Sequence, residues 1–355
     1  MHLPSLPHNP SGGFAPPFDN QKTQTYISNI LGAPLTAAAA VPFGASHRHY
    51  LLRTTNGQFV AKIYPHQPFI LSHPLARQQE LYQFFHRRGV LTPPVIHRGR
   101  LANDDFFIMP YITGEGDGWV ISQQLTKDQL LLPPADNSQP HFLSAWAEQL
   151  AIIHHSRADF CRQFITICYP ADHDHWRERK QRDLNLQLTD AAPMPTAAER
   201  LARHLMQQLL DHPAIKPTTD SSAYHATSDF VPLHGDYRLG NVLVAGLGQE
   251  PRLTAILDWE LAGFGLALED IGWLSAPCWH YARPDLAQQP LADFWRLYST
   301  ARHTLQYKDE AAGSGKHHPF PTSAPLPAIL PWFQSLAMLR WGLFAQKQWQ
   351  RKQAG

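Results

Sequence analysis

The sequence predicts an α+β protein with two lobes: a small antiparallel-sheet lobe over residues 21–112 and a larger, mainly helical lobe over residues 113–355. A chain of 355 residues fits about two domains of roughly 100–200 residues each. Short apolar runs separated by turn residues, typical of strands, dominate the first third of the chain. Apolar residues at helical spacing dominate after residue 141.

Residues 1–20 are rich in proline and glycine, which predicts a flexible tail. This stretch lacks a basic start followed by an apolar core, so it is typical of neither a secretory signal nor a membrane anchor. Uninterrupted apolar runs stay below the ~20 residues that a membrane helix needs. We therefore expect a cytoplasmic protein without a membrane partner.

The composition narrows the classes of ligand further. The chain has 30 Lys and Arg against 29 Asp and Glu, so no global field favours binding to nucleic acid or to an anionic membrane. An anionic ligand must then be held locally. The three cysteines show no paired metal-ligand spacing and are interpreted as small, reduced side chains of a cytosolic protein. Nothing in the sequence predicts an oligomeric state.

The first lobe is predicted to have the order β-β-α-β-β after a short helix. Asn56-Gly57 is a strong hairpin signal between the first two strands. In the helix, Leu81 and Phe85 share a face, and Gly89 is the expected stop. The predicted elements are a helix at 26–31, strands at 50–53 and 58–64, a helix within 73–90, and strands at 95–100 and 104–112.

The second lobe is predicted to consist mainly of long helices. Leu143, Trp146, Leu150 and Ile153 recur at three- and four-residue spacing, and the stretch TAAERLARHLMQQLL repeats this style. Three segments are expected to lack regular structure: a connector at 119–140, a polar irregular stretch at 169–184 and a surface loop at 309–327.

The stretch VPLHGDYRLGNVLV holds four polar residue types in one short loop between two apolar runs. His234 and Asp236 end a short strand, Asn241 follows five residues after Asp236, and a later strand, LTAILDWE, delivers Asp258. Such a trio suits phosphoryl transfer from a nucleotide: one Asp orients the acceptor hydroxyl, while the Asn and the other Asp bind Mg²⁺. The alternative is a polar turn with capping Asp and Asn, but the spacing between strands favours a site.

These residues, LHGDYRLGNVLV followed by AILDWELAGFGLALEDIGWL, resemble the aminoglycoside phosphotransferase and choline kinase superfamily, which has a protein-kinase-like fold. The stretch is most similar to the phosphotransferase-like domains related to those fused to acyl-CoA dehydrogenases. The resemblance runs from about residue 25 to about residue 350. It implies a kinase that uses ATP and Mg²⁺ and phosphorylates a hydroxyl group of a small molecule.

The resemblance also implies roles for single residues. Asp236 matches the catalytic Asp, and Asn241 and Asp258 match the metal ligands. His234 matches the His that supports the catalytic loop by hydrogen bonding, and Asp270 matches an acidic residue that we interpret as structural.

The nucleotide end of the site is less explicit. Lys62, in FVAKIY, matches the family lysine that pairs with the α- and β-phosphates, and Glu80 in the next helix is the expected ion-pair partner. An exposed strand lysine and a solvated helix face are the alternatives for these two residues. In the loop FGASHRHY, Ser46 is placed to reach a phosphate.

The stretch FFIMPYITGE resembles the hinge between the lobes of the family, where backbone groups near Met109 and Tyr111 bind adenine. Met109 is as well explained as a core residue. One departure from the family is Leu266, where many relatives have an Asp. This change weakens a contact near the metal rather than the metal site itself.

Several other signals are given a structural interpretation. His173 and His175 alone do not make a transition-metal site, and His154 is expected to be a hydrogen-bonded core histidine. The run RERKQR is interpreted as a solvated helix face or as a lip that attracts an anionic acceptor. Core packing near the acceptor site is expected for Trp273, Trp279, Trp332 and Trp341.

The acceptor itself is left open. A hydroxylated acyl compound, an amino alcohol such as choline, a sugar and an aminoglycoside are the alternatives, and the lack of a dense acidic run counts against the aminoglycoside. Arg340, beside Trp341, is expected either to hold an anionic acceptor or to form a salt bridge. The alternative from another class is a nucleotide-binding scaffold without turnover.

Overall fold

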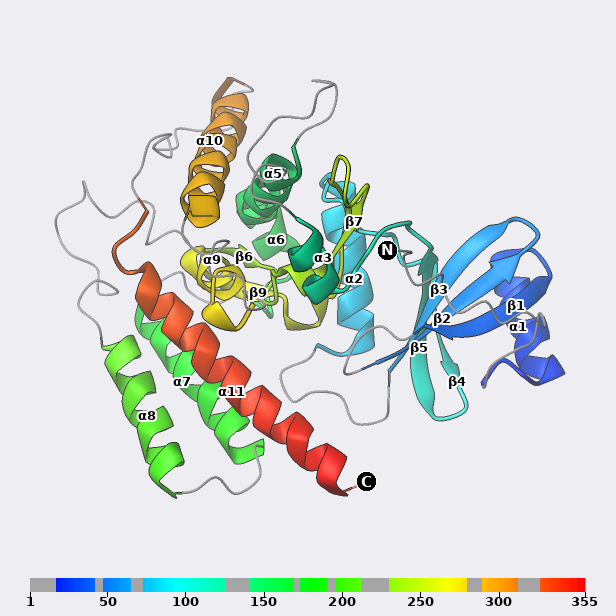
Figure 1. Cartoon of the computed structure of the whole chain (residues 1–355), viewed down its shortest axis with the longest axis horizontal. Coiled ribbons are helices and arrows are strands. Elements are labelled where there is room, and N and C mark those ends of the chain that lie inside the picture. The colour runs from blue at the N-terminus through cyan, green and yellow to red at the C-terminus, as the bar shows by residue number, and fades with distance from the viewer. Residues whose placement is uncertain are drawn as a thin grey trace. The chain divides into compact units, whose positions relative to one another are not determined.

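The computed structural model describes residues 17–41, 47–64, 73–125, 141–168, 173–190, 196–211, 230–279, 289–311 and 326–354. The chain divides into two compact units. The first comprises residues 1–87 and 91–113, and the second comprises residues 88–90 and 114–355. The α+β class expected from the sequence is confirmed, because a five-stranded antiparallel sheet forms the first unit and helices predominate in the second (Figure 1).

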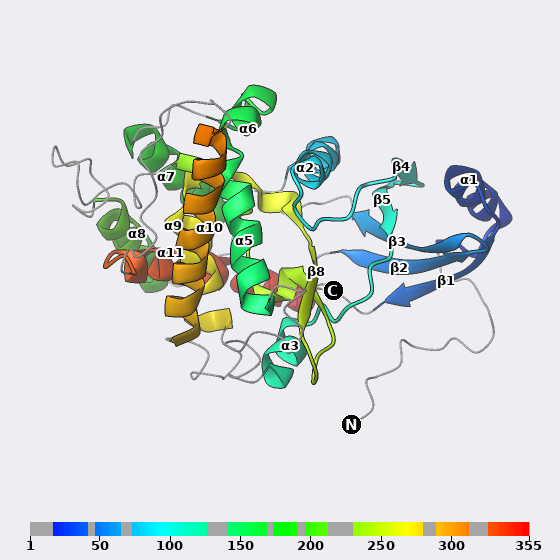
Figure 2. The same cartoon turned by 90° about the horizontal axis from the view of Figure 1, so that it is seen from above.

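The first unit is a sheet of strand order β1-β2-β3-β5-β4 in which every neighbouring pair is antiparallel (Figure 2). The hairpin at Asn56-Gly57 connects β2 to β3, as the sequence predicts, and β3 is the central strand. The elements are α1 (Gln21–Leu31), β1 (Leu35–Val41), β2 (Arg48–Thr54), β3 (Gly57–Tyr64), α2 (Leu75–Arg87), β4 (His97–Leu101) and β5 (Asp104–Pro110).

Two features of this unit differ from the sequence-based prediction. Strand β1 was not predicted, because its run of four alanines lacks the alternation of apolar and polar side chains that marks a strand. Phe18 falls within the predicted flexible tail, yet it is fully buried and packs edge-on against Tyr50, with 5.1 Å between ring centroids. An aromatic side chain that buries this much apolar surface fixes the chain just before α1.

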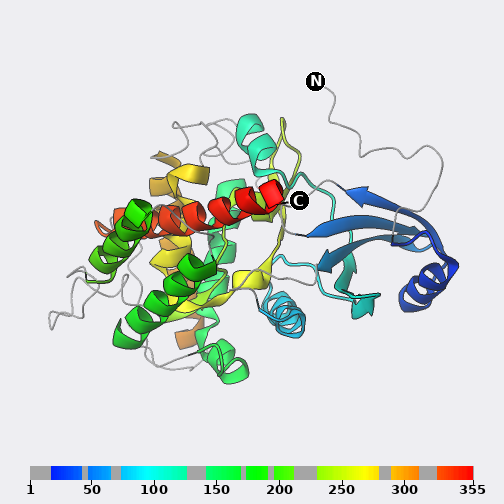
Figure 3. The same ribbon diagram turned by 90° about the horizontal axis from the view of Figure 1, so that it is seen from below.

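The second unit packs its helices around two short strand pairs, β6 with β9 and β7 with β8. Helices α5 and α10 run side by side (Figure 2), and α11 packs on α9, α7 and α8 (Figure 3). The elements are α3 (Gly118–Gln124), α5 (Phe142–His155), α6 (Arg157–Gln163), α7 (His173–Asp190), α8 (Thr196–Leu210), β6 (Phe230–Leu233), β7 (Val242–Ala245), β8 (Arg252–Ile256), β9 (Gly263–Leu266), α9 (Leu268–Leu274), α10 (Gln289–Ala311) and α11 (Leu330–Ala354).

The polar stretch expected to be irregular forms the 18-residue helix α7. Its buried apolar residues Trp176, Leu184 and Leu188 recur at multiples of four, so a narrow apolar stripe suffices to dock a mostly polar helix. The connector predicted at 119–140 overlaps α3, and its residues 126–140 lie outside the described part of the chain, as do residues 312–325 of the predicted surface loop. None of the described helices combines the length and the apolarity that a membrane span requires.

Candidate active site

The polar loop at 234–241 lies between strands β6 and β7, each of which pairs with a later strand. The backbone N–H of Leu257, just past β8, donates to the carbonyl of Asn241 at 2.8 Å. This bond fastens the end of the loop to the end of β8, where Asp258 is the next residue. Strand pairing therefore brings the predicted loop residues and Asp258 to one place, although they are far apart in the sequence.

The carboxylate of Asp236 is held by three side-chain donors. Oδ2 accepts from Nδ2 of Asn241 at 2.6 Å, and Oδ1 accepts from Nε of Arg238 at 2.9 Å and from Nε1 of Trp273 at 2.5 Å. The Asp236 side chain is 14% exposed. These contacts fix the orientation of a carboxylate that still reaches solvent, which is what a group that must meet a substrate hydroxyl requires.

Asn241 is buried, and its side-chain amide nitrogen donates two hydrogen bonds to Asp236. Nδ2 donates to the backbone carbonyl of Asp236 at 2.9 Å in addition to the carboxylate. The amide oxygen Oδ1 is then the part of the side chain left for a cation. An oxygen ligand in this position fits Mg²⁺, which prefers oxygen ligands.

Asp258 has a backbone conformation that is rare for any residue with a side chain. Its φ is 69° and its ψ is 72°, in the left-handed region. Such strain persists only where the surrounding structure holds it, and it occurs often at functional sites. Asp and Asn adopt this region more readily than other residues with a side chain, so the conformation favours a functional role for Asp258 without assigning one.

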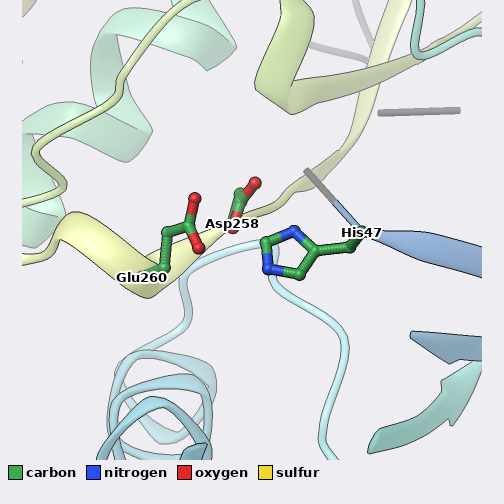
Figure 4. A group of neighbouring side chains, drawn as sticks. All are labelled: His47, Asp258 and Glu260. Atoms are coloured by element: carbon green, nitrogen blue, oxygen red, sulfur yellow. The ribbon is translucent and has the colours of Figure 1, made fainter. Parts of the chain in front are cut away.

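Glu260 follows Asp258 on the same turn, and carboxylate oxygens of the two residues lie within 4.8 Å of each other (Figure 4). Two carboxylates at this separation are suited to share one divalent cation. Glu260 was not among the residues predicted for the site. The signal was the spacing Asp-Trp-Glu directly after a strand, because the residue between the two acids is the buried Trp259.

His234 is completely buried and positions the loop. Its Nε2–H donates to the carbonyl of Leu257 at 3.0 Å, and its Nδ1 accepts from the backbone N–H of Asp236 at 3.2 Å. Burial lowers the pKa of His234 below the usual histidine value, so the neutral ring that these two bonds require is favoured. Both ring nitrogens of His234 are thus used in hydrogen bonds that hold the loop, as the sequence resemblance implied for this residue.

Asp270 fixes the start of the same loop through hydrogen bonds to its backbone. Its carboxylate accepts from the backbone N–H groups of His234 at 2.7 Å and Gly235 at 2.9 Å, and it contacts Nε2 of His154 at 3.2 Å. His154 also contacts the hydroxyl of Tyr298 at 2.8 Å, as expected for a hydrogen-bonded core histidine.

The charge of Asp270 is kept in spite of burial. Burial alone raises the pKa of a carboxyl, but the hydrogen bond from His154 and the electrostatic interaction with its ring lower the pKa of Asp270 below its usual value. Because the folded pKa lies below the unfolded one, Asp270 stabilises the fold above the usual carboxyl pKa. That contribution is lost as the pH falls toward the lowered value.

Leu266 is a buried residue of β9, and its backbone N–H donates to Oε1 of Glu269 at 3.0 Å. The same Glu269 oxygen accepts from Nε1 of Trp176 at 2.8 Å, and its other oxygen pairs with Lys180. Leu266 is thus part of the buried apolar core of this unit. The neighbouring Glu269 has become a docking point for α7.

Replacing Gly235 by alanine tests the packing of the loop. Gly235 has a φ of +81°, and an added Cβ would lie 2.0 Å from the carbonyl oxygen of Leu261. Gly248 is the matched control, because its φ is +83° and an added Cβ meets nothing within 4 Å. The left-handed conformation costs an L-residue roughly 1–2 kcal/mol at either position, and only Gly235→Ala adds a backbone clash. We expect Gly235→Ala to lower Tm clearly more than Gly248→Ala in thermal unfolding, whereas equal shifts would contradict this geometry.

In the first unit, Lys62 lies on the central strand β3 and is only 3% exposed, which excludes the exposed strand lysine. Its Nζ lies 5.1 Å from the ring centroid of Tyr64, and the Tyr64 hydroxyl donates to Oε1 of the buried Gln78 at 2.9 Å. The carboxylate of Glu80, expected beside Lys62, instead accepts from Arg77 at 2.8 Å and is 48% exposed.

The α2 residue that faces β3 is therefore Gln78. The sequence contained this signal, because residues 78, 81, 82 and 85 follow helical spacing and all are buried. Met109 is a buried residue of β5, and the backbone N–H of Tyr111 donates to the carbonyl of Gln58 at 3.0 Å, so this donor is already used. Ser46 lies outside the described residues.

Comparisons with known proteins give one family. Residues 38–308 match the model of a family described as the phosphotransferase enzyme family. No curated protein matches the chain. Among solved structures, choline kinase from Cryptosporidium parvum Iowa II is 12% identical, with a TM-score of 0.53 over 87% of this chain and 82% of that chain. A spectinomycin phosphotransferase solved with ADP and spectinomycin is 14% identical, with a TM-score of 0.47 over 94% of this chain and 99% of that chain. The likeness to choline kinase shows the fold alone, and it confirms the kinase-like fold that the sequence resemblance implied.

Proposed function

Because the chain belongs to the phosphotransferase enzyme family, we propose that it transfers the γ-phosphoryl group of ATP to a hydroxyl group of a small molecule. The observation that carries this proposal is the hydrogen bond from Nδ2 of Asn241 to Oδ2 of Asp236 at 2.6 Å. Asp258, with its left-handed backbone, follows the residue whose N–H is bonded to the Asn241 carbonyl. An oriented carboxylate beside two oxygen ligands for a cation matches the needs of phosphoryl transfer.

In this proposal, Asp236 accepts a hydrogen bond from the acceptor hydroxyl and takes its proton as the new phosphate ester forms. The contacts from Arg238 and Trp273 keep the carboxylate in one orientation, so the hydroxyl is aligned before reaction. Asn241 and Asp258 would hold Mg²⁺, with Glu260 as a further oxygen donor. The ion supplies positive charge that neutralises the phosphates.

We propose that Lys62 binds the α- and β-phosphates of the nucleotide. Its aliphatic stem is buried on the central strand, and the Tyr64 ring, held by Gln78, supports the ammonium group. Backbone groups near Met109 and Tyr111, other than the Tyr111 N–H that donates to Gln58, remain the proposed adenine contacts, and Ser46 the proposed phosphate contact. The proposal gives Glu80 no role in orienting Lys62.

We also propose that the protein is located in the cytoplasm. Cys161, Cys168 and Cys278 are free thiols of intermediate exposure, a state that fits the reducing cytoplasm. Burial raises the pKa of Cys278 to about 11, so this thiol stays protonated at neutral pH. A small-molecule acceptor, rather than nucleic acid or membrane, is the proposed partner.

One experiment distinguishes the proposed phosphotransferase from the alternative, a nucleotide-binding scaffold without turnover. Purified protein is incubated with ATP, Mg²⁺ and a panel of hydroxylated compounds from each acceptor class, and ADP release is followed with and without each compound. We expect ADP release that depends on both Mg²⁺ and one class of compound. Nucleotide binding without acceptor-dependent ADP release from any class would favour the scaffold.

A further inference from the structure

Three tryptophans form a cluster beside the candidate catalytic carboxylate. Trp273 on α9 lies 5.4 Å from Trp279, and Trp279 lies 4.7 Å from Trp341 on α11, between ring centroids. Trp273 and Trp279 are each 6% exposed. Because Nε1 of Trp273 donates to Asp236, this tryptophan cluster adjoins the place where an acceptor hydroxyl would lie.

Two guanidinium groups lie on the faces of these rings. Cζ of Arg238 is 4.5 Å from the ring centroid of Trp279, and Cζ of Arg340 is 4.7 Å from that of Trp273. Stacking on an aromatic face supports a guanidinium while leaving its in-plane N–H groups directed outward. The two arginines are held on adjoining rings, although they are about a hundred residues apart in the chain.

The charges in this cluster do not balance. Arg238 pairs with Asp236, whereas within the described ranges no carboxylate pairs with Arg340. The salt bridge considered for Arg340 from the sequence is therefore not found among those residues. The buried Nε1 of Trp279 also meets no acceptor among them. Among the hydrogen bonds and ion pairs of these described residues, Arg238 and Trp273 thus share the carboxylate of Asp236, while Arg340 and the Trp279 N–H have no anionic partner.

The two guanidinium groups on the tryptophan rings favour an anionic acceptor over a cationic one. A quaternary ammonium needs open aromatic faces, and a polyamine needs carboxylates, but here the protein's own cations cover two of the faces. Like charges this close would disfavour either cation. An anionic group, in contrast, would find a guanidinium with its planar donors still directed outward and would restore the charge balance.

Resting on the proposed function, we propose that the acceptor carries a carboxylate or phosphate group close to its reacting hydroxyl. Arg340 binds this anionic group through two parallel N–H donors, with Arg238 beside it, while Asp236 contacts the hydroxyl. The shared chemistry is a planar pair of anionic oxygens, which a guanidinium matches and an ammonium does not. Arg340 is in this account a specificity-determining residue.

The test uses matched acceptors and matched variants. Acceptors share one hydroxylated carbon chain and end in a carboxylate, a phosphate, a trimethylammonium or a neutral amide. ADP release is measured for wild-type protein, for Arg340→Gln and Arg340→Lys, and for the control Arg296→Gln, whose side chain is 62% exposed on α10. We expect an anionic acceptor to be preferred, and Arg340→Gln to raise its KM by about 10- to 100-fold, the scale of a charge-assisted bidentate contact.

Further readouts separate this role from a structural one. In Arg340→Gln, kcat, the nucleotide KM and Tm should stay near the wild-type values, and Arg340→Lys should recover only part of the acceptor affinity. The carboxylate and phosphate compounds distinguish the two sources of the anionic group. Preference for the trimethylammonium compound, or an acceptor KM unchanged in Arg340→Gln, would overturn the proposal, as would a lowered Tm with no change in KM.

A binding measurement keeps this proposal separate from phosphoryl transfer. Binding of the same four compounds is titrated by calorimetry in wild-type protein and in Arg340→Gln. Binding of the anionic compounds to wild-type protein alone would support the acceptor class even if no ADP were released, in which case the proposed function is the part that fails. Absence of binding by both anionic compounds would overturn the acceptor class itself.

Discussion

Replacing Asp236 by asparagine is expected to lower turnover by about 10²- to 10⁴-fold, the usual scale for loss of a general base, with little change in nucleotide affinity. The change keeps the size of the side chain and removes the negative charge that accepts from Arg238, Trp273 and Asn241. The acceptor hydroxyl then loses the group that aligns it and takes its proton. Steady-state kinetics gives kcat, and calorimetry gives the nucleotide Kd.

The control for this variant is Asp211→Asn, which removes a partly exposed carboxylate at the end of α8. It should leave both kinetic constants unchanged. Thermal unfolding of both variants establishes that the loop is intact. Near-normal turnover of folded Asp236→Asn protein, with any acceptor that the wild-type protein uses, would remove Asp236 from the mechanism.

Replacing Asp258 by asparagine is expected to abolish Mg²⁺-dependent nucleotide binding while the protein stays folded. Asparagine tolerates the left-handed backbone that Asp258 adopts, so the variant removes charge without adding strain. Removing the ligand itself should cost more than the ~10- to 100-fold in metal affinity that loss of a ligand's supporting partner costs. Calorimetric titration with ATP, in the presence and absence of Mg²⁺, measures the effect.

Two further variants serve as comparisons for Asp258→Asn. Asp258→Ala should show the same loss of nucleotide binding together with a lower Tm, since alanine is disfavoured at a φ of 69°. Glu250→Gln removes an exposed carboxylate on the turn between β7 and β8 and should bind Mg²⁺ and nucleotide normally. An unchanged affinity for Mg²⁺ and ATP in Asp258→Asn would rule out Asp258 as the metal ligand.

The parts of the fold that the sequence predicted are those in which local pattern and tertiary packing agree. The hairpin between β2 and β3 lies where Asn56-Gly57 indicated it, with Thr55 and Asn56 forming the turn between the paired residues Thr54 and Gly57. Helix α5 follows from its apolar spacing. The loop at 234–241 was predicted because polar residues between two apolar strands need a reason that local structure does not provide.

The parts that were missed depend on contacts with distant residues. Strand β1 is an alanine run whose conformation is set by pairing with β2, and α7 is a charged segment that becomes a helix by docking Trp176 and Lys180 on Glu269. Propensity is a weak guide where such contacts decide. The similarity to domains fused to acyl-CoA dehydrogenases stays a prediction.

In the candidate site, too, local sequence pattern indicated some features, while others depend on contacts between distant residues. The types and spacing of Asp236, Asn241 and Asp258 indicated a metal and a hydroxyl, because that chemistry restricts the residues that serve it. Gln78 shares the buried face of α2 with Leu81 and Phe85, whereas Glu80 lies two positions further on and is exposed, so helical spacing carried a signal that the expectation for Glu80 overlooked. Side-chain partners, such as the tryptophan face on which Arg340 lies, follow from packing and not from spacing.

The central claim is that the γ-phosphoryl group reaches a hydroxyl of the acceptor, and the most direct measurement follows that group. Protein, Mg²⁺ and ATP labelled at the γ-phosphorus are incubated with the anionic hydroxylated compounds, and the products are separated. The account predicts label on the acceptor in an amount equal to the ADP formed, in wild-type protein and not in Asp236→Asn. Label released as inorganic phosphate, or retained in ATP with every acceptor, would contradict it.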